Sequence, residues 1–303
     1  MIRMPKDSSG RILLRGCGTA LATAFSHSGL DEDAIRSFVE WQVTEGIHFV
    51  VPCGSTGEAA TMSPEEHRRV VEITVEQVNH RVPVVAGAGS NDTKKAIALS
   101  KEMKSIGATH LLHTSPMYNK PPQRGIIAHF TAIADAVELP IVVYNVPGRT
   151  GSNLEAGTTL SLAEHANITA VKEASGNLAQ IAEIIRNRPD NFTVLSGDDA
   201  LTLAVMAEGG DGVISVTSNA TPRMAARVVE LYDHGDVEGA RRLAHQLAPW
   251  TTAAFVESNP VPLKAALAMM GKMQNVLRLP LVPLKASYEE TVRSSLAAAG
   301  AVA

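Results

Sequence analysis

The feature of this sequence that most constrains its fold is a regular alternation of short apolar runs with longer amphipathic stretches. Strands that alternate with helical patterns of about 10–15 residues predict parallel βαβ units. Eight such units predict an α/β fold in which the sheet closes into a (β/α)8 TIM barrel rather than staying open. The eight predicted strands are residues 18–25, 47–53, 82–86, 110–114, 141–144, 168–172, 192–195 and 212–216.

The stretches between these runs carry helix-start signals. Ser63, Pro64 and Glu66 supply an N-cap, a first-turn proline and a glutamate that reaches back, in the order of a capping box. Aspartates take the N-cap position of three further predicted helices. We therefore expect N-caps at Asp31, Asp92 and Asp198, and helices over residues 31–45, 64–79, 93–106, 125–137, 177–188 and 200–208.

The alternation stops after Thr221, and only helical patterns follow it. Because no further strand alternates with these helices, they indicate an appended region rather than more barrel. We predict a barrel domain over residues 1–235, which includes a polar extension over residues 1–15, and a small C-terminal helical domain over residues 236–303. The helical patterns of this part of the chain are residues 222–234, 237–254, 261–270 and 287–299.

Charge and cysteine content narrow the possible functions. The 303 residues carry a net charge of −4 without any block of Lys and Arg, so neither nucleic acid nor an anionic membrane is an expected partner. Two cysteines and no CxxC pattern exclude a disulfide framework and a cysteine zinc site, and they suit a reducing, cytoplasmic compartment. We expect no secretory signal, and no run of about 18 apolar residues could span a membrane.

Lys172 is the most informative single position. In a barrel of this kind the reacting groups lie at the carboxyl ends of the strands, and Lys172 ends the sixth apolar run. Burial disfavours the ammonium form, and the free amine that results attacks ketones to form a Schiff base. The structural alternative is a lysine that clears the strand end and meets solvent or Glu173.

Three more residues at strand ends have suitable chemistry. Tyr144 closes the fifth run and Tyr118 lies in the loop after the fourth, and a phenol at either place can transfer a proton without a metal. Both rings could instead simply pack with their hydroxyls bonded to backbone. Arg149, in a predicted loop after the fifth run, could clamp a carboxylate through its planar fork or be an ordinary surface arginine.

The motif GSTGE at residues 54–58 follows the second strand. Ser55 and Glu58 match a capping box, which is one interpretation. The other is that the backbone amides of this turn bind a carboxylate at a helix start, with the Ser55 hydroxyl relaying a proton between two phenols. The two interpretations are compatible, so this motif alone discriminates little.

Together these motifs resemble the dihydrodipicolinate synthase / N-acetylneuraminate lyase family of pyruvate-dependent, class I aldolase-type barrels. The resemblance rests on GSTGE at 54–58, YNVPGRTG at 144–151 and VKEASGN at 171–177, three separated motifs in the family's order. It runs from about Gly18 to the C-terminus and includes residues 115–121, 196–199, 212–219 and 258–260. The arginine after Tyr-Asn-Val-Pro favours the dihydrodipicolinate synthase branch, because sialic-acid lyases typically lack it.

The resemblance implies that the chain condenses pyruvate with L-aspartate 4-semialdehyde to 4-hydroxy-tetrahydrodipicolinate, a step of lysine and diaminopimelate biosynthesis. It assigns the Schiff base to Lys172 and the general acid/base role to Tyr144. Ser55 and Tyr118 complete a hydroxyl relay, with Tyr118 reaching into the site of a neighbouring subunit. This implies a homo-oligomer, and family members are usually homotetramers built from dimers.

The resemblance also implies the groups that bind the substrates. Backbone amides of Ser55 and Thr56 hold the pyruvate carboxylate, and Arg149 holds the carboxylate of the aldehyde substrate. Gly197 and Ile214 line the pocket. Because the lysine itself performs the electrophilic work, no metal, pyridoxal phosphate or other cofactor is required.

The sequence departs from the family pattern in two places. The synthases more often carry threonine where Ser55 stands, so the hydroxyl is kept and the stiffness of a β-branched side chain is lost. Members inhibited by L-lysine hold it with serine, histidine, glutamate and tyrosine. A lysine facing the ammonium of the effector would repel it, so we expect weak or absent feedback. The matching residues here are Ala59, Pro64, Lys95 and Met117.

Three alternatives remain open from the sequence. A sister aldolase could use the same lysine on N-acetylneuraminate or a 2-keto-3-deoxy sugar acid. A pyridoxal enzyme would also use Lys172, but the sequence has no strong phosphate loop. The third is a catalytically silent barrel that binds keto acids.

Overall fold

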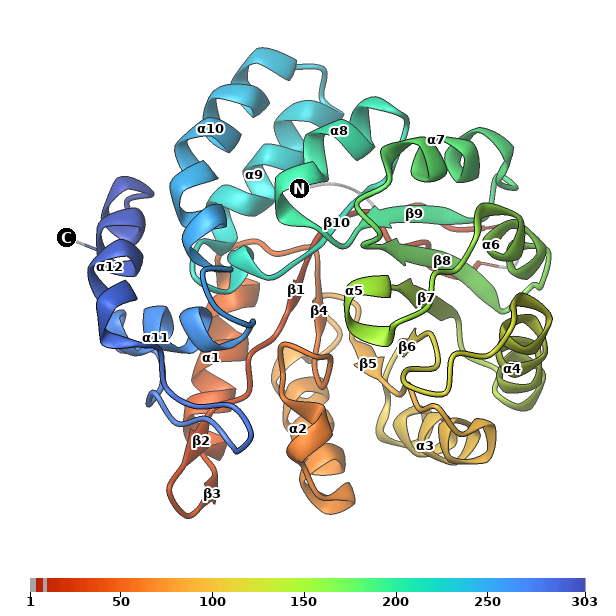
Figure 1. Cartoon of the computed structure of the whole chain (residues 1–303), viewed down its shortest axis with the longest axis horizontal. Helices are drawn as coiled ribbons and strands as arrows, with labels where there is room; N and C mark the ends of the chain where they lie inside the picture. The colour runs from red at the N-terminus through yellow and green to blue at the C-terminus, as the bar shows by residue number, and fades with distance from the viewer. Residues whose placement is uncertain (1–3, 8–9, 303) are drawn as a thin grey trace. The chain divides into compact units, whose positions relative to one another are not determined.

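The computed structural model describes residues 4–7 and 10–302. Within them, eight parallel strands follow the order β4-β1-β10-β9-β8-β7-β6-β5, and a parallel bridge joins Val50 of β4 to Val84, the residue before β5. The predicted (β/α)8 barrel with additional C-terminal helices is confirmed (Figure 1). The strands are β1 (Gly16–Ala20), β4 (Phe49–Val51), β5 (Val85–Gly87), β6 (His110–Thr114), β7 (Ile141–Asn145), β8 (Ile168–Glu173), β9 (Thr193–Ser196) and β10 (Gly212–Ser215).

The described chain consists of two compact units. The first contains Cys17–Val84 and residues 215–302, and the second contains residues 4–7, 10–16 and Val85–Ile214. In the first unit, β1 pairs with β4 so that Gly18 lies opposite Phe49. A side chain at Gly18 would begin 2.0 Å from the Phe49 ring, so only glycine leaves room for this buried aromatic residue.

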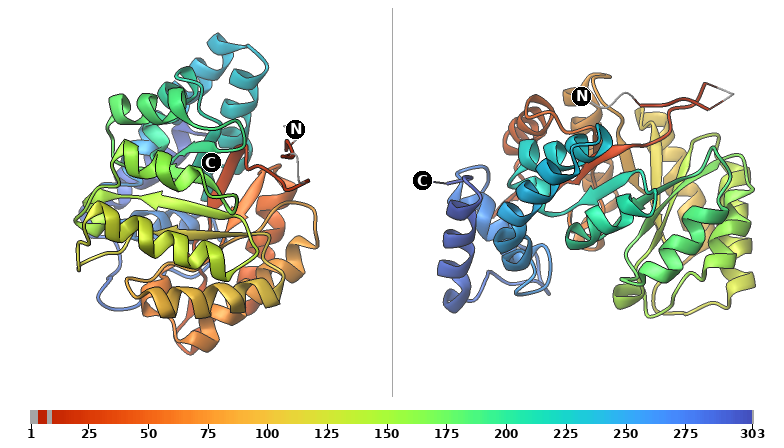
Figure 2. Two further views of the ribbon diagram at one scale, coloured as in Figure 1. Left: turned by 90° about the vertical axis from the view of Figure 1, so that its right-hand side faces the viewer. Right: turned by 90° about the horizontal axis from the view of Figure 1, so that it is seen from above.

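The helices of the first unit come from both ends of the chain. The elements are the hairpin strands β2 (Phe25–Ser26) and β3 (Gly29–Leu30), α1 (Glu32–Thr44), η1 (Ala59–Thr61), α2 (Pro64–Val78), η3 (Thr217–Asn219), α9 (Pro222–Asp233), α10 (Val237–Ala253), α11 (Val261–Met269), η4 (Ala286–Tyr288) and α12 (Glu289–Ala298). The N-terminal pair of helices packs side by side, and in the C-terminal group α10 packs against α9 and α12, and α12 against α11 (Figures 1 and 2). Trp250 is buried within this C-terminal group and donates its indole N–H to the carbonyl of Thr217 over 3.0 Å.

The second unit repeats the strand–helix pattern. The helices are α3 (Thr93–Ile106), α4 (Gln123–Ala136), α5 (Pro147–Thr150), α6 (Ala156–Ala163), α7 (Leu178–Asn187), η2 (Asp199–Leu201) and α8 (Thr202–Ala207). Its longer helices lie on the outer side of the strands, where α3 contacts α4, α4 contacts α6, α6 contacts α7 and α7 contacts α8, and nearly every strand residue is buried (Figures 1 and 2).

The helix-start predictions are confirmed, whereas the extent of the first strand and the stretch between β7 and β8 were predicted wrongly. Ser63 and Glu66 form a complete capping box, and Asp31, Asp92 and Asp198 each accept a hydrogen bond from the backbone of the helical turn that follows. The first strand ends at Ala20 rather than at residue 25: the Leu21 amide still donates to the carbonyl of Val51, but the amide of Ala22 donates to the Asn219 side chain rather than to a neighbouring strand. Helix α6 was missed because its sequence, AGTTLSLA, has weak helix formers and little amphipathic pattern.

Helices α10, α11 and α12 all begin after residue 236, whereas the domain boundary at residue 235 stays a prediction. The predicted extension over residues 1–15 includes residues 1–3, 8 and 9, which lie outside the described part. Among the described residues, no helix combines the length and the apolar character needed to cross a bilayer.

Candidate active site

Lys172 is a buried amine on the sixth barrel strand. It lies in β8, all of whose residues are buried, and only 4% of its surface is exposed. Burial lowers the pKa of Lys172 to about 8, while the negative charge of Asp199 raises it and the positive charge of Arg149 lowers it further. At pH 7 roughly one-tenth of such a group is free amine, far more than for an exposed lysine.

Tyr144, on the adjacent strand β7, is the direct neighbour of Lys172. The two residues are register partners in the parallel pair β7 and β8, and the Lys172 Nζ atom lies 4.3 Å from the centroid of the Tyr144 ring. Burial raises the pKa of Tyr144 to about 12, with a smaller opposing effect of the Arg149 charge. The phenol is therefore protonated at neutral pH and can donate a proton beside the amine.

Arg149 follows Tyr144 on a single helical turn rather than in the predicted loop. Helix α5 begins at Pro147 directly after β7, and its proline is suited to a first helical position. The Arg149 side chain is exposed, but its charge acts on the pKa values of both Lys172 and Tyr144. An exposed guanidinium placed this close to a buried amine can bind an incoming carboxylate.

Tyr118 is the most exposed of the predicted site residues. Its side chain is 89% exposed, and its φ of +71° belongs to the left-handed region that a large residue seldom adopts. The loop is anchored by a 3.2 Å hydrogen bond from the Tyr118 amide to the carbonyl of Thr150, at the end of α5. The backbone at Tyr118 is strained and the loop is anchored, while the aromatic ring is exposed. Such a ring is suited to contact another molecule.

Gly197 lies against the side chain of Lys172. It follows β9, and a Cβ atom placed on it would come within 3.1 Å of the Lys172 Cγ atom and 2.7 Å of the Ala174 Cβ atom. Glycine at this position therefore leaves the space in which the lysine side chain lies. Ile214, on β10, is fully buried.

The residues next to Tyr144 and Lys172 form a polar cluster that sequence analysis missed. The Asn145 Nδ2 atom donates to both oxygens of Glu173 over 3.1 Å, and the amide of Ser175 and the Gln180 side chain donate to the same carboxylate. Because side chains alternate along a strand, this cluster points away from the Lys172 and Tyr144 side chains. It fixes β7 against β8 at the level where those two side chains meet.

The GSTGE turn lies in the first unit. Ser55 is exposed and Thr56 is buried, with the Thr56 hydroxyl accepting a 2.9 Å hydrogen bond from Asn259. Among the described residues, no protein group accepts from the amides of Ser55 and Thr56. Two free amides in a row can bind a carboxylate.

The capping-box interpretation of this turn is wrong. Glu58 has a left-handed φ of +57°, and no helix begins at Ser55. The Glu58 carboxylate instead accepts from the ammonium of Lys264 over 2.7 Å. The sequence could not show this, because Lys264 lies more than two hundred positions further along the chain.

The structure thus brings together part of the predicted set. Lys172 lies against both Tyr144 and Gly197, and the charge of Arg149 acts on the pKa values of Lys172 and Tyr144. Among the described residues, no group of three His, Cys, Asp or Glu side chains is arranged to hold a metal ion. A buried lysine with a lowered pKa beside a phenol, at the carboxyl end of a barrel strand, defines the class of barrels that can form a Schiff base with a ketone.

Comparison with known proteins places the chain within that class. Residues 13–299 match the Dihydrodipicolinate synthetase family, and the chain belongs to this family. It is 50% identical over 290 residues to the 4-hydroxy-tetrahydrodipicolinate synthase of Koribacter versatilis, covering 95% of this chain and 96% of that one. The synthase of Thermodesulfovibrio yellowstonii is 45% identical, with 96% and 100% covered. The crystal structure of dihydrodipicolinate synthase from Thermotoga maritima superimposes with a TM-score of 0.94 at 38% identity, with 96% and 100% covered.

Proposed function

We propose that this chain acts as a 4-hydroxy-tetrahydrodipicolinate synthase, which condenses pyruvate with L-aspartate 4-semialdehyde in lysine and diaminopimelate biosynthesis. The observation that carries the proposal is the buried Lys172 amine, 4.3 Å from the Tyr144 ring centroid, in a member of this family. Relatives at 45% and 50% identity over nearly the whole chain carry the same activity in their names.

The first half of the reaction activates pyruvate. The free amine of Lys172 attacks the ketone carbon, and the resulting carbinolamine loses water to give an iminium ion. The iminium withdraws electrons from the adjacent methyl group, which gives a proton to the Tyr144 phenolate and becomes a nucleophilic enamine. Tyr144 donates the proton that lets the hydroxyl leave as water.

The second half forms the new carbon–carbon bond and releases the enzyme. The enamine carbon attacks the aldehyde of aspartate semialdehyde, and the alkoxide that forms takes up the proton held by the Tyr144 phenol. The amino group of the bound product then attacks the iminium carbon, which closes the ring and displaces the Lys172 amine. The product is 4-hydroxy-tetrahydrodipicolinate, and the lysine returns to its starting state.

Other side chains bind and orient the two substrates. We assign the pyruvate carboxylate to the amides of Ser55 and Thr56, and the carboxylate of aspartate semialdehyde to Arg149. Ser55 and Tyr118 relay protons to Tyr144. Gly197 and Ile214 line the pocket, and the space that Gly197 leaves beside Lys172 supports its part in this assignment.

Assembly and location follow from the same proposal. Tyr118 serves the site of a neighbouring subunit, and the active form is a homotetramer built from two dimers, in the cytoplasm. The 89% exposure of the Tyr118 side chain in the single chain supports a role across a subunit boundary. A solved relative, 38% identical with a TM-score of 0.94, is described as a monomeric dihydrodipicolinate synthase variant, so assembly has to be measured for this chain.

Two measurements test the proposal. Borohydride reduction in the presence of pyruvate, followed by mass spectrometry of peptides, should place the adduct on Lys172 alone. A coupled assay with the reductase that consumes the product should show turnover of pyruvate with aspartate semialdehyde. Turnover of a sugar acid instead would indicate a sister aldolase, and an adduct without any turnover would indicate a silent keto-acid-binding barrel.

A further inference from the structure

We propose that Lys264 and Glu58, with Arg278, are positioning residues that set the geometry of the Ser55–Thr56 turn and thereby the affinity for the pyruvate carboxylate. This inference rests on the proposed function and deepens it. It starts from a buried ion pair that the reaction itself does not use. The Lys264 Nζ atom lies 2.7 Å from the Glu58 Oε1 atom, and neither side chain has any exposed surface.

Burying the charges of Lys264 and Glu58 is unfavourable in free energy, so their presence in the protein interior needs an explanation. Removing two charges from water costs several kcal/mol for each ion, and a well-packed apolar pair of similar volume is often as stable or more stable. Stability alone therefore does not explain the pair. Lys264 also lies 4.5 Å from the centroid of the buried Phe25 ring, and the Arg278 guanidinium carbon lies 4.2 Å from the same centroid.

The pair has a specific place in the chain. Glu58 is the last residue of the GSTGE turn, and its left-handed backbone ends that turn before η1 begins. Its second oxygen, Oε2, accepts a 3.1 Å hydrogen bond from the backbone amide of Arg278. Two segments from the C-terminal part of the first unit therefore hold the same carboxylate, and with it the end of the turn.

A second contact holds the middle of the same turn. The Asn259 side chain, just before α11, donates to the Thr56 hydroxyl over 2.9 Å, and Lys264 lies on α11 itself. The backbone amide of Lys264 bonds to the carbonyl of Pro260, which ties the two contacting residues into one rigid element. The segment from Asn259 to Lys264 therefore hydrogen-bonds to the turn at Thr56 and at Glu58, on both sides of Gly57.

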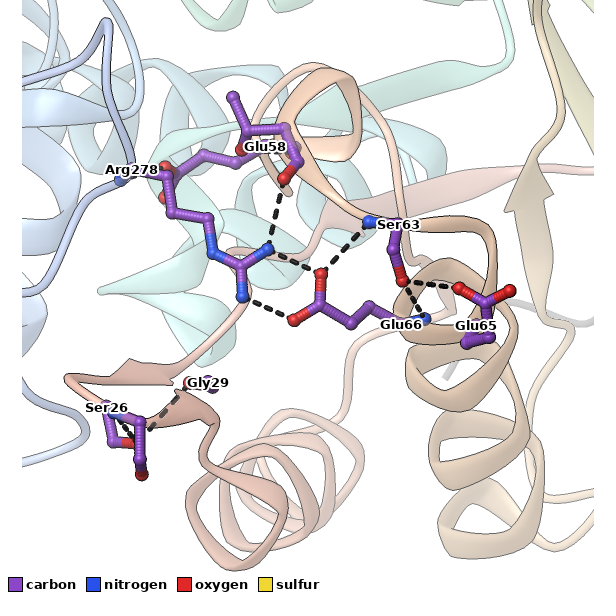
Figure 3. A network of polar contacts seen from close by, with 9 residues as sticks. Ser26, Gly29, Glu58, Ser63, Glu65, Glu66 and Arg278 are labelled. Carbon is purple, nitrogen blue, oxygen red and sulfur yellow. Dashed lines mark hydrogen bonds and ion pairs between the residues drawn. The ribbon is translucent and has the colours of Figure 1, made fainter.

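The Arg278 side chain extends the network to the start of α2. Its guanidinium donates to the carbonyl of Thr61 over 3.0 Å and to Glu66 over 2.6 Å, and Glu66 also closes the capping box with Ser63. Figure 3 shows the Arg278 guanidinium directed at Glu66, with Ser63 on the other side of that carboxylate. The chain is therefore held both within the turn and where α2 begins, so the intervening backbone has little freedom.

The functional consequence concerns two backbone amides. A pair of amides binds a carboxylate well only when both N–H groups point at it, and an error of about 1 Å in a reacting group can cost about 100-fold. The Lys264–Glu58 pair acts on these amides through the backbone of the turn and touches no substrate. It should therefore affect pyruvate binding much more than binding of the aldehyde.

The test separates positioning from stability with two variants. Lys264→Met leaves the Glu58 carboxylate buried without its cation, so it should lose both stability and pyruvate affinity. Glu58→Gln/Lys264→Met removes both charges, keeps an acceptor for the Arg278 amide, and should recover the unfolding midpoint. The matched control is Arg69→Met, which breaks the partly exposed 2.6 Å ion pair with Glu32 in the same unit.

The readouts are the pyruvate concentration that half-saturates borohydride trapping, the KM for aspartate semialdehyde, and the unfolding midpoint. We expect the double variant to raise the half-saturating pyruvate concentration by about 10-fold or more while the aldehyde KM changes by less than about twofold. Wild-type pyruvate binding in a double variant of wild-type stability would overturn the inference, because the pair would then serve stability only.

If the double variant does not fold, Arg278→Met replaces a side chain that is partly exposed; it should raise the half-saturating pyruvate concentration to a smaller extent, and an unchanged value would overturn the inference. If the wild-type protein traps no pyruvate at all, the proposed function fails first, which is a different result from wild-type trapping with unaffected variants.

Discussion

Replacing Gly197 by alanine adds one methyl group beside the reacting lysine. The new Cβ atom would lie 2.7 Å from the Ala174 Cβ atom and 3.1 Å from the Lys172 Cγ atom. Carbon atoms without a bond between them prefer about 3.5–4.0 Å, so the first contact has to lengthen by about 1 Å and the second by about half as much. Over-packing of this kind costs about 1–3 kcal/mol of stability.

The larger effect should fall on chemistry. Because a shift of about 1 Å in a reacting group can cost about 100-fold in rate, we expect Gly197→Ala to slow imine formation by between about 10-fold and 100-fold. The assay is the rate of pyruvate trapping by borohydride at saturating pyruvate, with the unfolding midpoint measured in parallel. The control is Gly157→Ala, whose added methyl group meets no atom within 4 Å. A Gly197→Ala protein that traps pyruvate at the wild-type rate would refute the assignment of this space to the lysine.

Four further predictions concern the same site. Lys172→Ala should lower kcat by at least about 10³-fold in the coupled assay and abolish trapping, and residual trapping would point to another lysine. Because burial lowers the pKa of Lys172 to about 8 and only the free amine attacks, the trapping rate should rise with pH and level off above about pH 8; a rate still rising at about pH 10 would indicate an exposed amine. Arg149→Ala should raise the KM for aspartate semialdehyde by about 10-fold or more with a smaller change in kcat, whereas an effect confined to kcat would contradict carboxylate binding. L-Lysine at low millimolar concentration should inhibit weakly or not at all, and near-normal feedback inhibition would show that Lys95 does not repel it.

Much of the fold was predictable from local patterns in the sequence. The strand at His110–Thr114 and the helix at Thr93–Ile106 have the predicted bounds, because an apolar run and a capped amphipathic stretch are both local signals. The first strand was overestimated because residues 21–25 are mostly apolar and buried although the barrel strand ends at Ala20. The Ala22 amide donates instead to the distant Asn219 side chain, a tertiary contact that no local pattern could reveal.

The candidate site shows the same limit. Lys172 and Tyr144 could be singled out because each ends an apolar run, and the register of two parallel strands brings them together. The role of Glu58 could not be seen, since its partners Lys264 and Arg278 come from the far end of the chain. A local capping-box pattern gave the wrong partner for a residue whose true partners are set by tertiary structure.

Two adjacent buried ionisable residues on β8 show why one of them is suited to chemistry. Glu173 is fully bonded, with Asn145, Ser175 and Gln180 all donating to its carboxylate. The side chain of Lys172, one residue earlier and facing the other way, has neither a hydrogen bond nor an ion pair with any described residue, and its neighbour is the face of the Tyr144 ring. Burial without a hydrogen-bonded anion disfavours the ammonium form and lowers the pKa of Lys172, even though the charge of Asp199 opposes this, whereas hydrogen bonds hold the Glu173 carboxylate in place. On the same buried strand, the Glu173 carboxylate is therefore held by hydrogen bonds in a structural role, and the Lys172 amine remains available to react.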